Sequence, residues 1–178
     1  YGLGKSGIST YNFLRHKAKV NLFDDNPQSN LRFHKKNLSF TKILKCDFDF
    51  IIISPGIDFS KCKLSKYLKQ NSSKVYTDLD VFYSFFGNDS VTITGTNGKS
   101  TTAKLLYDVL RDQKKDARLV GNIGNPILSE KKIIKKTFFV IEASSYQLEY
   151  SKIFKSKYSA ILNITPDHIE RHKNFKNY

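Results

Sequence analysis

Short apolar runs alternate along the chain with longer stretches in which apolar residues recur every three or four positions. The short runs have the length of β-strands and the longer stretches that of amphipathic helices. This alternation is typical of an α/β fold built on a mostly parallel sheet. The expected strands lie at residues 20–23, 50–53, 74–76, 91–94, 118–120, 138–141 and 160–164.

Three helices are expected from the same pattern. One covers residues 6–17, after a glycine-rich turn, and the others cover residues 61–70 and 100–112. Leu64 and Leu68 are four positions apart in the second helix, as are Leu106 and Leu110 in the third, so each pair lies on one helix face. We expect these leucines to belong to the core.

A loop at residues 86–90, rich in Gly, Asn, Asp and Ser, separates two strand, Gly-turn and helix units. We expect a first domain at 1–88 and a second at 89–178. The first strand of the first unit should precede Tyr1, and the second unit looks cut short at Tyr178. Because the chain also contains no Met, the sequence reads as a fragment.

Composition and charge narrow the classes of protein. The chain of 178 residues is 39% hydrophobic and 13% aromatic, enough to bury a core, and no run approaches the roughly 20 apolar residues that cross a bilayer. We therefore expect a soluble protein without a membrane partner. The two cysteines favour a reducing, cytoplasmic compartment over a disulfide-rich secreted fold.

The net charge of +14 raises the alternative of a nucleic-acid-binding module. However, the lysines form short, scattered pairs such as Lys114-Lys115 and Lys131-Lys132, and no aromatic-basic RNA motif or helix-turn-helix pattern is present. A solvated Lys-rich surface is the simpler interpretation, and we expect no nucleic-acid partner.

The strongest chemical signal is the segment 93–101, where a strand runs into a Gly-rich turn and Gly-Lys-Ser-Thr opens a helix. Backbone amides at such a turn, together with the helix dipole, favour a polyphosphate. Lys99 can reach its outer phosphates, and the Ser100 hydroxyl can ligate Mg²⁺. The common P-loop pattern would require Gly at position 93, where this chain has Ile, so the loop from Gly95 is shorter.

Two further strand ends carry candidate ligands. Glu142 ends an apolar strand at the sheet edge where open α/β proteins bind their ligands, and it could hold Mg²⁺. Pro166 ends the last strand and places Asp167 and His168 in a loop beside the same edge. A lone His in a loop is more often a surface residue, so His168 decides little by itself.

A weaker signal lies at the beginning of the chain. Residues 2–7 fit GxGxxG, and Asp24 and Asp25 follow about 20 residues later, where a dinucleotide fold places its ribose-binding acid. An NAD-binding oxidoreductase is therefore an alternative, beside a Rossmann-like fold that holds another phosphorylated ligand.

Taken together, these motifs resemble the Mur ligase family of ATP-dependent amide-forming enzymes, which includes the folylpolyglutamate synthases. The shortened loop at 94–101 is similar to that family's nucleotide loop. Three runs, at 121–124, 142–149 and 162–168, are most similar to the member that adds D-glutamate to UDP-N-acetylmuramoyl-L-alanine. The resemblance implies a Rossmann-like domain for the UDP part of the substrate, followed by an incomplete P-loop-type central ATPase domain.

The resemblance also implies roles for particular residues. Lys99, Glu142 and His168 would be catalytic, and Ser100, Glu142 and His168 would hold Mg²⁺. Asn122 and Ser144 would position the muramoyl peptide. The ATP loop would comprise Gly95, Thr96, Asn97, Gly98, Lys99, Ser100 and Thr101. The uridine site would comprise Gly4, Lys5, Ser6, Asp24, Asp25, Asn26, Ser54, Pro55 and Gly56.

The implied reaction is phosphorylation of the substrate's terminal alanine carboxylate by ATP, followed by attack of the D-glutamate amine on the acyl phosphate. We expect a monomer. The family's carbamylated lysine and third domain are not identifiable here, so the fragment should be inactive alone. Another Mur ligase or a folylpolyglutamate synthase-like enzyme remains an alternative within the family.

Overall fold

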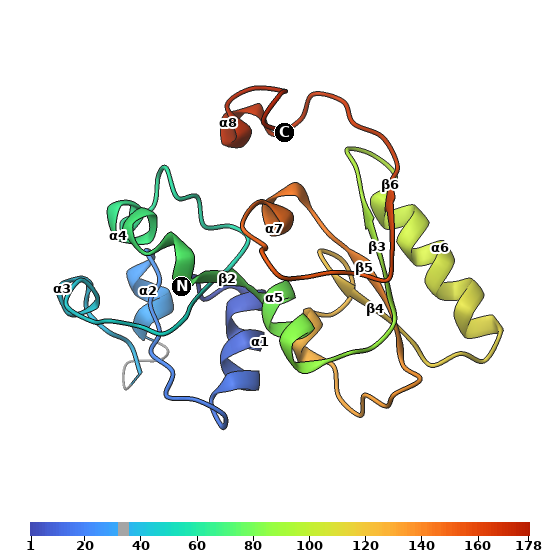
Figure 1. Cartoon of the computed structure of the whole chain (residues 1–178), viewed down its shortest axis with the longest axis horizontal. Helices are drawn as coiled ribbons and strands as arrows, with labels where there is room; N and C mark the ends of the chain where they lie inside the picture. Colours follow the sequence, from blue (N-terminus) through green and yellow to red (C-terminus); the bar gives the residue numbers. More distant parts are fainter. Residues whose placement is uncertain (32–35) are drawn as a thin grey trace.

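The structure is a computed structural model that describes residues 1–31 and 36–178 (Figure 1). It is an α/β structure with two parallel sheets, as the sequence predicted. The strands are β1 (Ile51–Ile53), β2 (Val75–Thr77), β3 (Ser90–Thr94), β4 (Ala117–Gly121), β5 (Phe138–Glu142) and β6 (Tyr158–Ile161). The α-helices are α1 (Lys5–Leu14), α2 (Pro27–Leu31), α3 (Phe40–Ile43), α4 (Ser65–Gln70), α5 (Asp78–Phe85), α6 (Lys99–Asp112), α7 (Ser145–Glu149) and α8 (Ile169–His172), and short 3₁₀ turns lie at η1 (Ser72–Lys74) and η2 (Ile127–Ser129).

The larger sheet has four parallel strands in the order β4-β5-β3-β6. All four strands were predicted within a few residues of their observed bounds. The expected last strand extended to residue 164, whereas β6 ends at Ile161, opposite the last residue of β3. Beyond that point β3 has become the Gly-rich loop, so the chain after β6 pairs with the loop and the ladder stops.

Both faces of this sheet are covered (Figure 1). The alternation of side chains along β5 sends Phe139 and Ile141 to a cluster with Phe82 of α5, whereas Val140 packs on the other face against Ala103 of α6. Leu106 and Leu110 pack against that second cluster, as predicted. The sheet is therefore a rigid platform, and its loops at the carboxyl edge are held from both sides.

The smaller sheet pairs β1 with β2 in parallel. Its core includes Leu64 and Leu68 of the α4 region, which are 3% and 0% exposed and confirm the expected apolar face. The observed helix α4 begins at Ser65, later than the expected start at residue 61, because the chain from 58 to 64 forms turns around Asp58.

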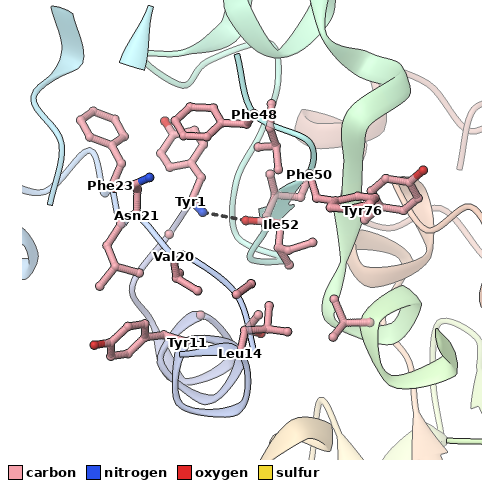
Figure 2. A pocket seen from close by; sticks show the side chains of 18 of the residues that line it. Tyr1, Tyr11, Leu14, Val20, Asn21, Phe23, Phe48, Phe50, Ile52 and Tyr76 are labelled. Carbon is pink, nitrogen blue, oxygen red and sulfur yellow. Dashed lines mark hydrogen bonds between the residues drawn. The ribbon is translucent and has the colours of Figure 1, made fainter. Parts of the chain in front are cut away.

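The strand expected at residues 20–23 is wrong. Within residues 1–31 and 36–178, Leu22 is the one member of this segment that makes a bridge, to Asn37, and residues 20–23 line a cavity of about 840 Å³. A strand needs a neighbour along its length to complete its ladder. The other walls of the cavity include Leu14 of α1, together with Phe50 and Tyr76 around the smaller sheet (Figure 2).

Helix α5 was not predicted, and it connects the two sheets. Its first turn is closed by a capping box between Thr77 and Asp80. The second carboxylate oxygen of Asp80, Oδ1, accepts the Ser151 hydroxyl and the backbone N–H groups of residues 152, 153 and 154 at 2.9–3.0 Å. A single buried carboxylate thus anchors the chain after α7 to the beginning of α5.

None of the helices in residues 1–31 and 36–178 has the length and apolar character that crossing a bilayer requires.

Candidate nucleotide and substrate site

The Gly-rich loop joins the carboxyl end of β3 to the amino end of α6. Gly95 and Gly98 have φ values of +134° and +83°, a region that side-chain-bearing residues rarely adopt. Gly98 is the N-cap of α6, a helix of 14 residues. Among the described residues, no side chain caps this helix by a hydrogen bond, and its first turn contains no acidic residue. The amide groups and positive dipole end of α6 therefore favour an anion at this loop.

Lys99 folds back over this loop. Its ammonium Nζ donates to the carbonyl oxygens of Gly95 and Thr96 at 2.7 and 2.8 Å. An ammonium has three N–H donors, so one remains for a phosphate oxygen even while both loop carbonyls are bonded. Ser100 and Thr101 follow in the first turn of α6 and are exposed.

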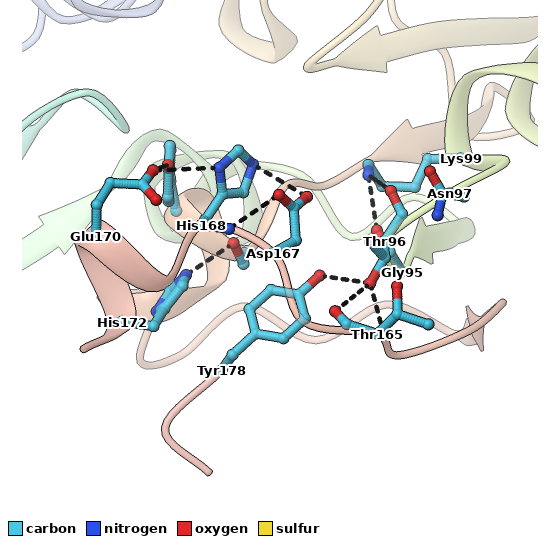
Figure 3. A network of polar contacts seen from close by, with 12 residues as sticks. Gly95, Thr96, Asn97, Lys99, Thr165, Asp167, His168, Glu170, His172 and Tyr178 are labelled. Atoms are coloured by element: carbon cyan, nitrogen blue, oxygen red, sulfur yellow. Dashed lines mark hydrogen bonds and ion pairs between the residues drawn. The ribbon is translucent and has the colours of Figure 1, made fainter. Parts of the chain in front are cut away.

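The chain after β6 holds the loop from the other side (Figure 3). The Asn163 side chain both accepts from the N–H of Asn97 and donates to its carbonyl, each at 2.9 Å. The Thr96 hydroxyl donates to the Thr165 carbonyl at 3.1 Å and accepts the Thr165 N–H at 3.0 Å. Two residues of the loop are thus fixed by paired hydrogen bonds.

Glu142 lies beside the same loop. It is the last residue of β5 and pairs in register with Ile93, two residues before Gly95. Its side chain is 0% exposed, and Oε1 accepts from Asn122 Nδ2 at 2.8 Å. The other carboxylate oxygen, Oε2, is buried and has no hydrogen-bond partner in the described part of the protein. A buried, unpartnered carboxylate oxygen costs about 1–3 kcal/mol or more, so this atom calls for a partner.

These features fit a magnesium ion. Mg²⁺ takes oxygen ligands and is usually held by one or two carboxylates and hydroxyls together with phosphate oxygens. The Glu142 carboxylate and the Ser100 hydroxyl are such donors. Within residues 1–31 and 36–178, no three His, Cys, Asp or Glu side chains gather as a metal cluster, which is consistent with an ion that depends on a nucleotide for its other ligands.

Asn122 and Ser144 flank Glu142 at the ends of neighbouring segments. Asn122 follows β4, and its backbone N–H also donates to the Glu142 carbonyl at 2.9 Å. Ser144 is the N-cap of α7, and its hydroxyl accepts the Gln147 N–H at 3.3 Å in a capping box. Both residues lie at the carboxyl edge of the sheet, Asn122 after β4 and Ser144 two residues after the end of β5.

His168 lies in the loop between β6 and α8, with a side chain 44% exposed. Its ring nitrogens are 3.5 Å from the Asp167 carboxylate and 3.6 Å from that of Glu170, and its ring is 4.7 Å from that of Tyr146. Burial, and then the nearby Glu170 carboxylate, raise the pKa of the Tyr146 phenol. His172 instead is buried and hydrogen-bonds Ser145 Oγ at 2.9 Å (Figure 3).

The candidate uridine residues gather at the corresponding edge of the smaller sheet. Asp24 accepts the N–H of Leu3 at 2.5 Å and that of Asn26 at 2.8 Å, so its carboxylate ties the two segments together. The Ser54 hydroxyl donates to the Gly2 carbonyl at 2.7 Å, which joins a third segment. The other members of this group follow directly: Gly4, Lys5 and Ser6 begin α1, Asp25 follows Asp24, and Pro55 and Gly56 follow Ser54.

Residues 93–178 match the family model described as the Mur ligase middle domain. Residues 93–178 are a Mur ligase middle domain. This assignment is consistent with the shortened loop from Gly95, with Glu142 and with the chain after β6 that holds the loop.

Three curated relatives of the chain carry the name UDP-N-acetylmuramoylalanine--D-glutamate ligase. Those from Rickettsia bellii and Caldicellulosiruptor bescii are each 37% identical to it, over 100% and 99% of the chain, and the one from Rickettsia felis is 35% identical over 100%. The chain spans about two fifths of the length of these relatives, 40%, 41% and 40%.

Sequence reasoning missed two contacts of the site. Asn163 lies in the run at 162–168 without a predicted contact to the loop, although a side-chain amide at a strand end beside a Gly-rich loop is a usable signal. No local pattern marks Arg171, because its partners lie as far as 114 positions away in the sequence.

Proposed function

We propose that this chain is the UDP-substrate and ATP-binding part of a ligase that adds D-glutamate to UDP-N-acetylmuramoyl-L-alanine at the expense of ATP. The proposal depends on the carboxylate of Glu142, whose Oε2 is buried and has no hydrogen-bond partner among the described residues. Glu142 ends β5 in register with Ile93, which leads into the Gly-rich loop. The names of the curated relatives support this ligase over an oxidoreductase.

In the proposed mechanism the chain binds and aligns, as proteins do in other phosphoryl transfers. The amides of the loop and of the α6 amino end hold the phosphates, and Lys99 stabilises negative charge that develops on the γ-phosphate. Ser100 and Glu142 would hold a magnesium ion, which neutralises charge on the β- and γ-phosphates when bound. His168 would assist at a second ion near the acceptor carboxylate.

Asn122 and Ser144 would position the muramoyl peptide beside Glu142. The substrate's alanine carboxylate then attacks the γ-phosphorus and ADP leaves. The D-glutamate amine then attacks the acyl carbon and loses a proton. The bond between this carbon and the phosphate oxygen breaks, phosphate leaves with the electron pair, and an amide remains. Glu142, Lys99 and the Gly-rich loop lie at one sheet edge, and this arrangement supports the transfer of the γ-phosphate to the substrate carboxylate.

Residues 1–88 would form a Rossmann-like unit for the UDP group, and residues 89–178 would form the ATP-binding unit. The cavity in the first unit supports this interpretation, because residues 20–23 and β1 stand on opposite sides of it. The N–H of Gly2 donates to the Phe23 carbonyl and the N–H of Ser54 donates to the Tyr1 carbonyl, both at 2.9 Å. Backbone that bridges the two walls in this way is typical of the end of a central parallel strand.

The proposal is tested with the full-length protein, by measuring phosphate release with a panel of UDP-muramoyl precursors and amino acids. We expect turnover with UDP-N-acetylmuramoyl-L-alanine and D-glutamate. Preference for a tripeptide precursor or for L-lysine would assign the protein to another Mur ligase. NAD(H) binding that Asp24→Ala weakens would instead support the oxidoreductase alternative.

We expect Lys99→Ala to weaken Mg-ATP binding at least about 100-fold, because it removes the cation nearest the outer phosphates. Isothermal titration with Mg-ATP measures this loss. Lys104→Ala is the matched control, since Lys104 lies on the same helix, is exposed and pairs with Asp108. Equal losses in the two variants would contradict the role of Lys99.

A further inference from the structure

Arg171 is a nearly buried cation outside the proposed nucleotide loop, and its guanidinium has both hydrogen-bond and aromatic partners. Its side chain is 6% exposed, and Nε donates to Glu149 Oε2 at 2.8 Å. Nη2 donates to the backbone carbonyl of Ile57, also at 2.8 Å. The guanidinium carbon lies 4.7 Å from the ring centre of Tyr146 and 5.6 Å from that of Tyr150, within cation–π range.

These partners belong to two separate segments, and Arg171 lies in a third. Ile57 directly follows the turn at residues 54–56, which forms a wall of the proposed uridine site. Tyr146, Glu149 and Tyr150 belong to α7 and its end, next to Ser144. Arg171 itself lies in α8, where its N–H donates to the His168 carbonyl at 3.0 Å. One side chain therefore joins the uridine end of the proposed site to its metal and acyl end.

Other contacts show that this junction is packed. The rings of Phe59 and Tyr150 stack with centroids 4.0 Å apart, which brings the chain after Ile57 against the end of α7. His172 bonds Ser145, so the α8 segment is also held at its next residue. The guanidinium holds its donors in one rigid plane and lies within cation–π range of two aromatic rings, a geometry that the compact ammonium of a lysine does not reproduce.

We propose that Arg171 is a positioning residue that sets the distance between the turn at 54–56 and the loop carrying Asp167 and His168. The proposal rests on the proposed function, because the UDP-muramoyl substrate would span that distance. A shift of about 1 Å between the two ends would misalign the acceptor carboxylate and cost up to about 100-fold in rate. The nucleotide loop is held separately, through Asn163 and Thr165. The binding of ATP should therefore be insensitive to this shift.

The test compares Arg171→Lys with wild type in the full-length protein. We expect the KM for the UDP-muramoyl substrate to rise about tenfold and kcat to fall, whereas the KM for ATP changes less than about twofold. Arg118→Lys is the matched control, because Arg118 is also partly buried and paired, with Asp116 and Glu130, but does not touch these segments. Glu149→Gln keeps an acceptor for Nε and should show only a small effect.

A second measurement does not depend on turnover. Amide hydrogen exchange should increase at residues 54–58 and at residues 167–172 together in Arg171→Lys, and at neither in Arg118→Lys. If no UDP-muramoyl precursor is a substrate but exchange increases at both segments, the proposed function fails and the coupling stands. Unchanged exchange, or faster exchange with an unchanged KM for the UDP-muramoyl substrate, overturns the positioning role.

Discussion

At the scale of single residues, Glu142 carries the largest chemical consequence. Its buried carboxylate has one bonded and one unpartnered oxygen, an arrangement that costs stability unless a cation or donor arrives. A ligand that binds only the folded state and satisfies this oxygen would stabilise the protein. Stability and ligand response are therefore coupled at this one atom, and the coupling can be measured.

We predict that Glu142→Gln stabilises the protein in the absence of nucleotide, because it removes a buried charge and keeps the bond from Asn122. The unfolding free energy should increase by about 1–3 kcal/mol, and the thermal midpoint should rise accordingly. The same variant should lose the stabilisation that Mg-ATP gives to wild type. Thermal unfolding with and without Mg-ATP measures both effects. Glu130→Gln serves as the control, and a Mg-ATP shift of wild-type size in Glu142→Gln would contradict the prediction.

Among the residues that the structure describes, Asp78 is a second buried carboxylate with an unpartnered oxygen, Oδ1. Burial raises the pKa of this group from 3.8 to about 6, although the Leu79 N–H and the Ser6 hydroxyl partly oppose the shift. Since the folded state binds the proton more tightly, the contribution of Asp78 to stability is highest below the unfolded pKa. It falls as the pH rises from about 4 to 6 and stays lower above that range.

We predict that Asp78→Asn removes this pH dependence. Relative to wild type, the variant should gain little at pH 4 and up to about 3 kcal/mol at pH 7.5, since the pKa shift is about two units. Urea unfolding across this pH range measures the difference. Asp89→Asn is the control, because Asp89 is exposed and paired with Lys157. A constant difference between Asp78→Asn and wild type would exclude the proposed cause.

At the scale of elements, the anchor between α5 and the chain after α7 depends on Asp80. Burial by itself would raise the pKa of Asp80, but the backbone N–H groups of Thr77 and of residues 152–154 hold it below its ordinary value. The contribution of Asp80 to stability is therefore present above the unfolded carboxyl pKa and is lost as the pH falls through the folded pKa.

We predict that Asp80→Asn destabilises the fold by about 3 kcal/mol or more at pH 7, because an amide cannot accept all the bonds that both carboxylate oxygens accept. The loss relative to wild type should shrink in acid. Urea unfolding measures it, and limited proteolysis should become faster around residues 151–154. Asp108→Asn on the exposed face of α6 is the control, and equal stability of the two variants would contradict the role of the anchor.

Across the elements, local patterns predicted the strands of the larger sheet and the loop from Gly95, because alternation and Gly chemistry act over a few neighbouring residues. The prediction of a strand at 20–23 was wrong, because a strand forms only beside a neighbouring strand, and the local sequence pattern does not show whether one is present. Helix α5 was missed although Thr77 and Asp80 form a readable capping box. Asp80 and Arg171 could not be assigned because their partners lie 71–74 and up to 114 positions away.

At the scale of the whole molecule, two sheets present their carboxyl edges to a common region, and a few long-range contacts hold them in place. The anchor at Asp80 and the contacts of Arg171 both join the first 88 residues to the chain that follows β5. The proposed substrate would therefore lie across segments that no single domain orders alone. Loss of either contact should affect substrate alignment before it affects the nucleotide loop.

The strand order β4-β5-β3-β6 has a consequence for how the chain assembles. Strands β3 and β4 follow one another in the sequence but are not neighbours, because β5 lies between them. As the ribosome releases the chain, β4 can find no place beside β3 until residues 138–142 have emerged and inserted. The insertion that closes the sheet is the one that delivers Glu142, so this half of the protein cannot complete its sheet without also completing its candidate magnesium ligand.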